Sequence, residues 1–428
     1  MRALRHAGFF CTPPRTLRVG WQALAARRRA VRLGWRLRSA LRVIALLVVV
    51  CPCLAGAVAA QALQEIRIAY LSQLSERPPS LSNLELPPEN EGIAGGELAI
   101  ADNNVTGRFL NQAFSFKSIS ISVEGDSLAA FRDLVEEGFQ FIVLNVPPAP
   151  LLKMADAVRD RNVLLFNVGA PDDRLRDADC RSNLFHILPS RSMLTDGLAQ
   201  YLVWKRWRDW FLVVGQRERD ALFAEAVRRS ARKFGARIVA ERSWEYGPDA
   251  RRTAQAEVPI FTQGVDYDVL VVADEIGEFG EYLAYRTWDP RPIAGTQGLT
   301  PTSWHWTQEQ WGGVQLQNRF TDQFGRRMTA LDYQLWSAIR VLGEAATRTN
   351  ASSFEAIDAY IRSDGFEFAA FKGQKLTFRS WNLQLRQPIL LAGPTALVSV
   401  SPQEGFLHQG SLLDTLGLDE PESQCRLN

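Results

Sequence analysis

The chain has 428 residues, of which 49 are basic and 47 acidic, and its formal net charge is +2. The first sixty residues hold eleven of the basic residues, all arginines, and no acidic residue. The remainder therefore has 38 basic and 47 acidic residues, a net charge of −9. Nucleic acid is excluded as a partner, because it requires a basic face.

The arginine-rich start is followed by an apolar run from Val43 to Leu54 and then by the small residues 55–60. A basic region, an apolar run and an A-x-A-like end predict a secretory signal peptide over residues 1–60, cleaved near Ala59 or Ala60. A retained membrane anchor is the alternative, but a span needs about 20 apolar residues. We therefore expect an exported protein.

Cleavage leaves two cysteines, Cys180 and Cys425. An oxidising compartment favours a disulfide between them, and two unrelated thiols are the alternative. The mature chain is also longer than one hydrophobic core usually supports, so we expect two domains or lobes.

Strand and helix patterns alternate along the mature chain. Expected strands span residues 65–71, 115–123, 139–144, 163–168, 210–214, 236–240 and 267–273. Expected helices span residues 92–104, 127–137, 151–161, 191–207, 221–234, 329–349 and 353–363, with another between the last two strands. This alternation is typical of an α/β protein with parallel sheets covered on both faces. Ligands bind such sheets beyond the carboxyl ends of the strands.

Motifs for catalysis and cofactor binding are missing from the sequence. It has neither a glycine-rich phosphate loop nor a G-x-S-x-G nucleophile elbow. His186, His305 and His408 have no neighbour at metal-ligand spacing. We therefore expect no metal, no cofactor and no enzymatic activity, and an unrecognised catalytic arrangement is the alternative.

Several segments, in this order, resemble the type I periplasmic binding proteins, the branched-chain amino acid receptors of ABC importers. The similar segments are residues 95–104, 166–176, 330–338 and 373–378. The resemblance covers residues 63 to about 410 and implies two Rossmann-like lobes with three crossovers and a ligand cleft between the lobes. It assigns residues 63–187 plus 301–365 to lobe one and 188–300 plus 366–428 to lobe two.

Residues 180–186, 189–194, 201–207 and 421–426 resemble one branch of that family more narrowly. The branch accompanies dehydrogenase systems for alcohols that depend on pyrroloquinoline quinone (PQQ). The resemblance implies a monomeric periplasmic protein that captures a small solute and delivers it to an ABC permease. The solute is then linked to quinoprotein alcohol oxidation, with a periplasmic quinoprotein dehydrogenase as a further partner. The alternative is an accessory protein that binds a ligand, metal or cofactor for that dehydrogenase without transport.

The loops at the carboxyl ends of the strands supply the expected ligand-binding residues. They are Asn145, Asn167, Asp172, Asp173, Arg174, Arg191, Asp274, Glu275, Gln297 and Trp304. Other roles stay open for five of them. Asp172 and Asp173 also suit a helix N-cap from residue 175 onward, Asp274 and Glu275 a solvated loop, and Trp304 core packing.

The chain departs from the receptors at the turns that hold the carboxylate of an amino acid. These turns span residues 145–148 and 169–172 and contain prolines, which have no N–H to donate. Arg191 and Gln297 stand where the receptors have an acidic partner for the ligand ammonium group. We therefore expect a ligand other than an amino acid.

Overall fold

The computed structural model describes residues 63–76, 87–245, 250–406 and 408–427. The predicted signal peptide, residues 1–60, lies outside these residues. Within the described ranges, no helix is both long and apolar enough to cross a membrane.

The first lobe is built on a five-stranded parallel sheet with the order β2-β1-β3-β4-β5. Its strands are β1 (Gln64–Gln73), β2 (Gln112–Ile121), β3 (Phe141–Asn145), β4 (Leu164–Asn167) and β5 (Leu184–His186). Successive side chains of β1 enter opposite cores, as the alternation of a strand requires. Ile68 and Tyr70 pack on one face of the sheet, whereas Ala69 and Leu71 pack on the other.

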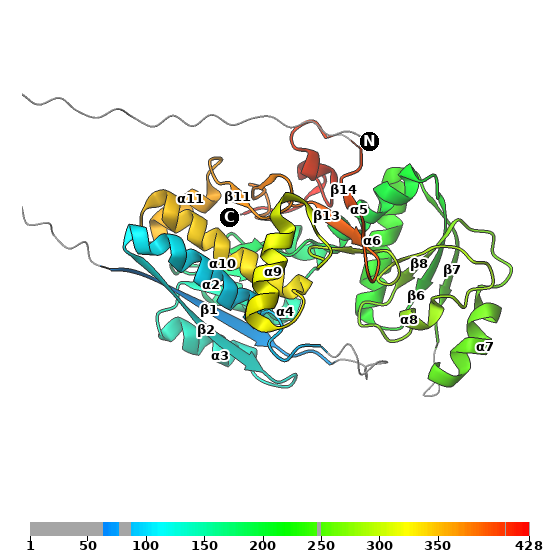
Figure 1. The fold of residues 1–428 in the computed structure, drawn as a ribbon, viewed down its shortest axis with the longest axis horizontal. Coiled ribbons are helices and arrows are strands. Elements are labelled where there is room, and N and C mark those ends of the chain that lie inside the picture. Colours follow the sequence, from blue (N-terminus) through cyan, green and yellow to red (C-terminus); the bar gives the residue numbers. More distant parts are fainter. Residues whose placement is uncertain (1–62, 77–86, 246–249, 407, 428) are drawn as a thin grey trace, which may run out of the picture. The chain divides into compact units, whose positions relative to one another are not determined.

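Helices cover both faces of this sheet (Figure 1). The face of Tyr70 is covered by α2 (Ile93–Leu110), α9 (Gly313–Phe324), α10 (Ala330–Thr349) and α11 (Phe354–Arg362). The opposite face is covered by α3 (Ser127–Glu136) and α4 (Pro148–Ala157).

The second lobe is built on a four-stranded parallel sheet with the order β7-β6-β8-β9. Its strands are β6 (Asp209–Val214), β7 (Arg237–Ser243), β8 (Val269–Ala273) and β9 (Ile293–Gly295). Helices α5 (Arg191–Trp204) and α6 (Glu218–Phe234) cover one face, and α7 (Ala250–Thr262) and α8 (Gly280–Leu283) the other. Gly235, at φ 75°, ends α6 as the sequence predicts.

The chain passes between the two cores three times. The crossings lie between Ile187 and Met193, between Leu299 and Trp304, and between Leu385 and Ile389. The second crossing contains β10 (Thr300–Thr302), and the third leads into β13 (Ile389–Ala392). These two strands form an antiparallel sheet with β14 (Leu397–Ser401). Shorter elements are the pair β11 (Phe368–Ala369) and β12 (Lys375–Leu376), and the 3₁₀ turns η2 (Asp173–Arg176), η3 (Gln310–Gly312), η4 (Leu412–Thr415) and η5 (Glu420–Glu422).

The expected α/β architecture with two lobes and three crossovers is confirmed, and three details differ. Helix α2 runs to Leu110, six residues beyond the predicted end. Residues 373–378, one of the segments that resemble the binding proteins, contain only the two-residue strand β12. Side chains between Phe366 and Leu385 pack in the core of the first lobe, although the sequence analysis assigned them to lobe two.

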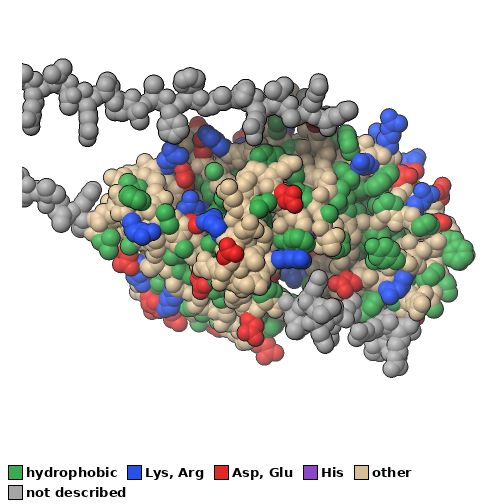
Figure 2. All heavy atoms as spheres, viewed as in Figure 1, with side chains coloured by type: hydrophobic (Ala, Val, Ile, Leu, Met, Phe, Trp, Pro, Cys, Tyr) green, Lys and Arg blue, Asp and Glu red, His purple; other side chains and the backbone are tan. Residues whose placement is uncertain are grey.

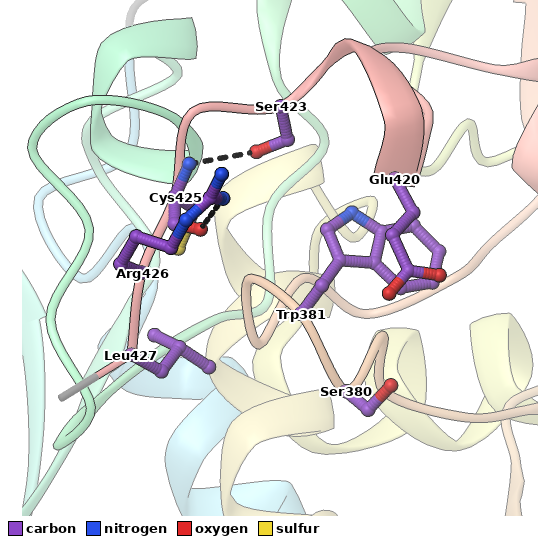
Figure 3. Close-up of a pocket in the computed structure, with 7 residues that line it drawn as sticks. All are labelled: Ser380, Trp381, Glu420, Ser423, Cys425, Arg426 and Leu427. Carbon is purple, nitrogen blue, oxygen red and sulfur yellow. Dashed lines mark hydrogen bonds between the residues drawn. The ribbon is translucent and has the colours of Figure 1, made fainter.

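The C-terminal tail connects the lobes a fourth time. Gly417 donates to Asp196 of α5, and Lys233 of α6 donates to the carbonyl of Gly417, both in the second lobe. Further along, Cys425 forms the expected disulfide with Cys180, which belongs to the first lobe, across 245 residues. Beside this bond a small cavity of about 260 Å³ is lined by Trp381, Arg426 and the tail (Figure 3).

Acidic and basic side chains are intermingled on the face of the molecule in Figure 2.

Candidate functional site

The main candidate site is a cavity of about 1150 Å³ beyond the carboxyl ends of β1, β3 and β4. The start of α6, in the second lobe, also lines it through Glu218, Arg219 and Leu222. A neighbouring cavity of about 360 Å³ shares Asn145, Gly169, Pro171, Arg219 and Leu331 with it. This position agrees with the rule that ligands bind beyond the carboxyl ends of parallel strands.

Neutral polar groups from three neighbouring strands line the first-lobe wall of this cavity. The Tyr70 hydroxyl accepts a hydrogen bond from Asn145 Nδ2 at 3.3 Å. The hydroxyls of Ser72 and Ser120 lie 3.0 Å apart. Burial raises the pKa of Tyr70 to about 12, so the phenol stays protonated at neutral pH. Of these residues, the sequence analysis singled out only Asn145.

Arg191 joins carboxylates from both lobes at one end of the cavity. Its Nε and Nη2 each donate to Glu275 at 2.7 Å, and its Nη1 lies 3.3 Å from Asp172 Oδ2. Burial alone would lower the pKa of Arg191, but the carboxylates of Glu275 and Asp172 outweigh it and raise the pKa. The three expected site residues are therefore brought together, with one guanidinium facing two carboxylates, so the cluster keeps a net negative charge.

Asp173 caps a helix, but a different one from the helix that the sequence suggested. Its carboxylate accepts from the backbone N–H of Ser192, in the first turn of α5, at 3.1 and 3.2 Å. Asp172 precedes η2 without a side-chain cap bond and lines the cavity instead. Burial raises the pKa of Asp173.

Arg174 lines the cavity from the first lobe with an exposed side chain. Its Nη1 lies 2.9 Å from Asp179 Oδ2, so its charge also has a partner within the protein.

Five of the expected ligand-binding residues do not line either cavity: Asp173, which caps α5, and Asn167, Gln297, Asp274 and Trp304. Asn167 is fully buried, and its Oδ1 accepts from the backbone N–H of Gly169 and Ala170, which shapes the turn after β4. Gln297 packs against Gly280 in the second lobe. Asn167 and Gln297 thus serve the local structure.

Asp274 and Trp304 also have structural positions. The carboxylate of Asp274 accepts from the four backbone N–H groups of residues 277–280 and holds the loop that leads into α8. Trp304 is 2% exposed and stacks on Tyr333 with ring centroids 4.7 Å apart. The alternative of core packing is therefore correct for Trp304.

Four residues that line the cavity are not among the predicted site residues: Tyr70, Ser72, Ser120 and Arg219. The position of Tyr70 and Ser72 at the carboxyl end of the first predicted strand was an available signal. The contribution of Ser120 depends on the pairing of β2 with β1, which places Ser120 opposite Ser72. Among the described residues, no group of three or more His, Cys, Asp or Glu side chains could hold a metal ion.

Comparison with known proteins identifies the fold. Residues 123–273 match a family model described as periplasmic binding protein. A periplasmic binding protein from Burkholderia mallei has a TM-score of 0.64 and 14% identity, with 85% of this chain and 99% of that chain covered. No curated protein matches the sequence.

Two further structures show the same similarity. A leucine-, isoleucine-, valine-, threonine- and alanine-binding protein from Brucella ovis has a TM-score of 0.64 and 13% identity, with 85% and 99% coverage. A solute-binding protein from R. palustris in complex with benzoate has a TM-score of 0.61 and 12% identity, with 86% and 100% coverage. The chain has the two-lobed fold of the type I periplasmic binding proteins.

Proposed function

We propose that this protein is the periplasmic substrate-binding protein of an ABC importer and captures a small organic solute between its lobes. The observation that carries the proposal is the 1150 Å³ cavity, lined by residues of both lobes in a two-lobed fold. Proteins with this fold include binders of branched-chain amino acids and of benzoate. Closure of the lobes on a solute would present the bound form to a permease.

Within this proposal, Asn145 contacts the solute directly, and the Arg191 cluster with Asp172 and Glu275 forms one end wall. Arg174 lies at the exposed border of the cavity. We further propose that the solute belongs to quinoprotein alcohol oxidation, with a quinoprotein dehydrogenase as a functional neighbour. The segments 180–186 and 421–426, which resemble the branch that accompanies such dehydrogenases, support this link.

The test is solute binding by the purified mature protein. A library of alcohols, aldehydes, organic acids, amino acids, quinone cofactors and metal ions is screened by tryptophan fluorescence and thermal unfolding. We expect a saturable change with at least one organic solute, because binding to the folded state raises the unfolding temperature. Silence across the library would contradict the proposal. Binding without any effect of gene deletion on uptake would favour an accessory role in place of transport.

A further inference from the structure

The ionised groups around the cavity are either paired or exposed. Those that line it are Glu89, Glu91, Asp172, Arg174, Arg191, Glu218 and Arg219. Ion pairs to Glu275, Asp172 and Asp179 engage both Arg191 and Arg174, and Glu91 has an interaction partner as well. Glu89, Glu218 and Arg219 are exposed, so water and salt screen their charges. Asp172 is the buried carboxylate among the described lining residues, and it already faces Arg191 at 3.3 Å.

Anion binding by helix N-termini is also restricted at this cavity. Helix α4 begins at its wall, but prolines at 147, 148 and 150 supply no N–H, and the N–H of Leu151 bonds to Pro147. At the start of α5, the first N–H groups are taken by Pro171, Asp173 and Ser190.

Helix α6 already carries Glu218 and Asp220 in its first turn. An anion binds a helix N-terminus through unpaired N–H groups and the positive end of the dipole. The starts of α4 and α5 are therefore poor sites for a ligand carboxylate, and at α6 the carboxylates of Glu218 and Asp220 oppose a further negative charge.

The polar groups that remain are uncharged. Tyr70 accepts from Asn145, which leaves the phenol proton for a ligand acceptor. In the bond between Ser72 and Ser120 one hydroxyl donates its only proton to the other, so one of the two can still donate and both can still accept. Apolar side chains form the adjoining walls: Val146, Pro147, Pro148, Ala170, Leu222 and Leu331.

From this distribution we infer that the cavity takes an uncharged organic compound with a hydroxyl or carbonyl group, which Tyr70, Ser72, Ser120 and Asn145 hold by neutral hydrogen bonds. The inference deepens the proposed function and depends on it. The ammonium group of an amino acid would have to compete with Arg191 for Asp172. A ligand carboxylate would find the buried cation of the wall, Arg191, already paired, and burying an unpaired charge is costly.

The test compares head groups on one carbon skeleton. One series is 4-methyl-1-pentanol, 4-methylpentanoate and L-leucine, and a second is 3-phenyl-1-propanol, 3-phenylpropanoate and L-phenylalanine. Isothermal titration calorimetry measures each compound at low salt and at about 0.5 M NaCl. We expect an alcohol to bind about tenfold or more tightly than the matched acid and amino acid, with little effect of salt.

The outcomes separate this inference from the proposed function. An acid or amino acid that binds as tightly as its alcohol overturns the neutral-ligand inference but leaves solute capture intact. If neither series binds and native mass spectrometry of freshly purified protein finds no small molecule, solute capture fails and the inference fails with it.

Two variants test the named groups. Tyr70→Phe and Ser120→Ala should each weaken binding of the preferred alcohol by about three- to tenfold, the effect of one neutral hydrogen bond. Tyr333→Phe is the matched control, because Tyr333 is equally buried but donates to Ala370 in the core of the first lobe. Equal affinities for wild type and both cavity variants would overturn the assignment of these groups.

Discussion

Arg191 and Glu275 form a buried two-pronged ion pair, with Nε and Nη2 each 2.7 Å from a carboxylate oxygen. The Arg191 side chain is 2% exposed, and its third nitrogen faces Asp172 of the other lobe. The pair thus lies where the first crossover enters α5. The single positive charge of Arg191 offsets only one of the two carboxylates, so the cluster of Arg191, Glu275 and Asp172 keeps a net negative charge.

Removal of the Arg191 charge should destabilise the protein strongly. In Arg191→Met two largely buried carboxylates lose their counter-charge, and breaking such a pair costs about 3–5 kcal/mol. Urea unfolding followed by tryptophan fluorescence measures the free energy of unfolding. Arg228→Met is the control, since Arg228 makes a similar two-pronged pair with Glu241 at the surface. In Arg228→Met we expect the unfolding free energy to fall by less than about 1 kcal/mol. Equal losses in the two variants would show that Arg191 is no more important for stability than a surface ion pair.

Lys372 should make stability depend on alkaline pH. Burial lowers its pKa well below 10.5, and Nζ donates to Gln387 and to the carbonyl of Pro388 at the third crossover. The ring centroid of Tyr333 lies 5.0 Å from Lys372 Nζ, and the Tyr333 phenol stays neutral because burial raises its pKa. At pH values between this lowered pKa and 10.5, Lys372 is therefore neutral in the folded protein but protonated in the unfolded chain. Stability rises with pH across that window.

The measurement compares wild type with Lys372→Met by urea unfolding from neutral pH to about 10.5. The difference in unfolding free energy should shift in favour of wild type as pH rises, because Met carries no proton. All other titratable groups are the same in the two proteins, so their titration cancels in this difference of unfolding free energies. A difference that is constant with pH would show that Lys372 keeps its ordinary pKa in the folded protein.

Continuous apolar runs made the central strands β3, β4 and β8 predictable, because both faces of these strands are buried. The end of α2 was not predictable in the same way. Val105 and Gly107 weaken helical propensity, but the lack of a side chain at Gly107 lets the helix approach the backbone of Gln112 closely. The helix therefore continues to Asn111, which ends it in the left-handed conformation.

The site was predictable in position but not in detail. Sequence places Asp172, Arg191 and Glu275 on loops beyond strands, yet it does not show that they pair with one another. Trp304 is a similar case, because its partner Tyr333 lies on a distant helix. An aromatic residue in a loop looks the same in sequence whether it stacks on a ligand or on the core.

Asp274 illustrates the difference between a ligand-binding carboxylate and a structural one. Its oxygens accept four backbone N–H groups, so Asp274→Ala should lower the unfolding free energy by at least about 2 kcal/mol. Chemical denaturation measures this loss. Asp266→Ala, at a fully exposed carboxylate, should change stability by less than about 0.5 kcal/mol. A fully stable Asp274→Ala protein with altered solute preference would instead assign Asp274 to the binding site.

The disulfide should hold only the last residues of the tail. In Cys425→Ser the 245-residue loop is open, and the loss of its closure should lower the unfolding free energy by about 2–5 kcal/mol. The segment near Gly417 stays anchored, because Asp196 accepts from Gly417 and Arg379 pairs with Asp414.

Hydrogen exchange with mass spectrometry tests this division of the tail. Exchange should accelerate in Cys425→Ser at residues 423–427, whose remaining contacts to the first lobe are few and partly exposed, while residues 414–417 keep wild-type protection. Asp196→Asn is the converse variant, because it removes charge from the anchor of Gly417 and leaves the disulfide in place. Equal loss of protection along residues 412–427 in Cys425→Ser would show that the disulfide, and not the ion pairs, anchors the whole tail.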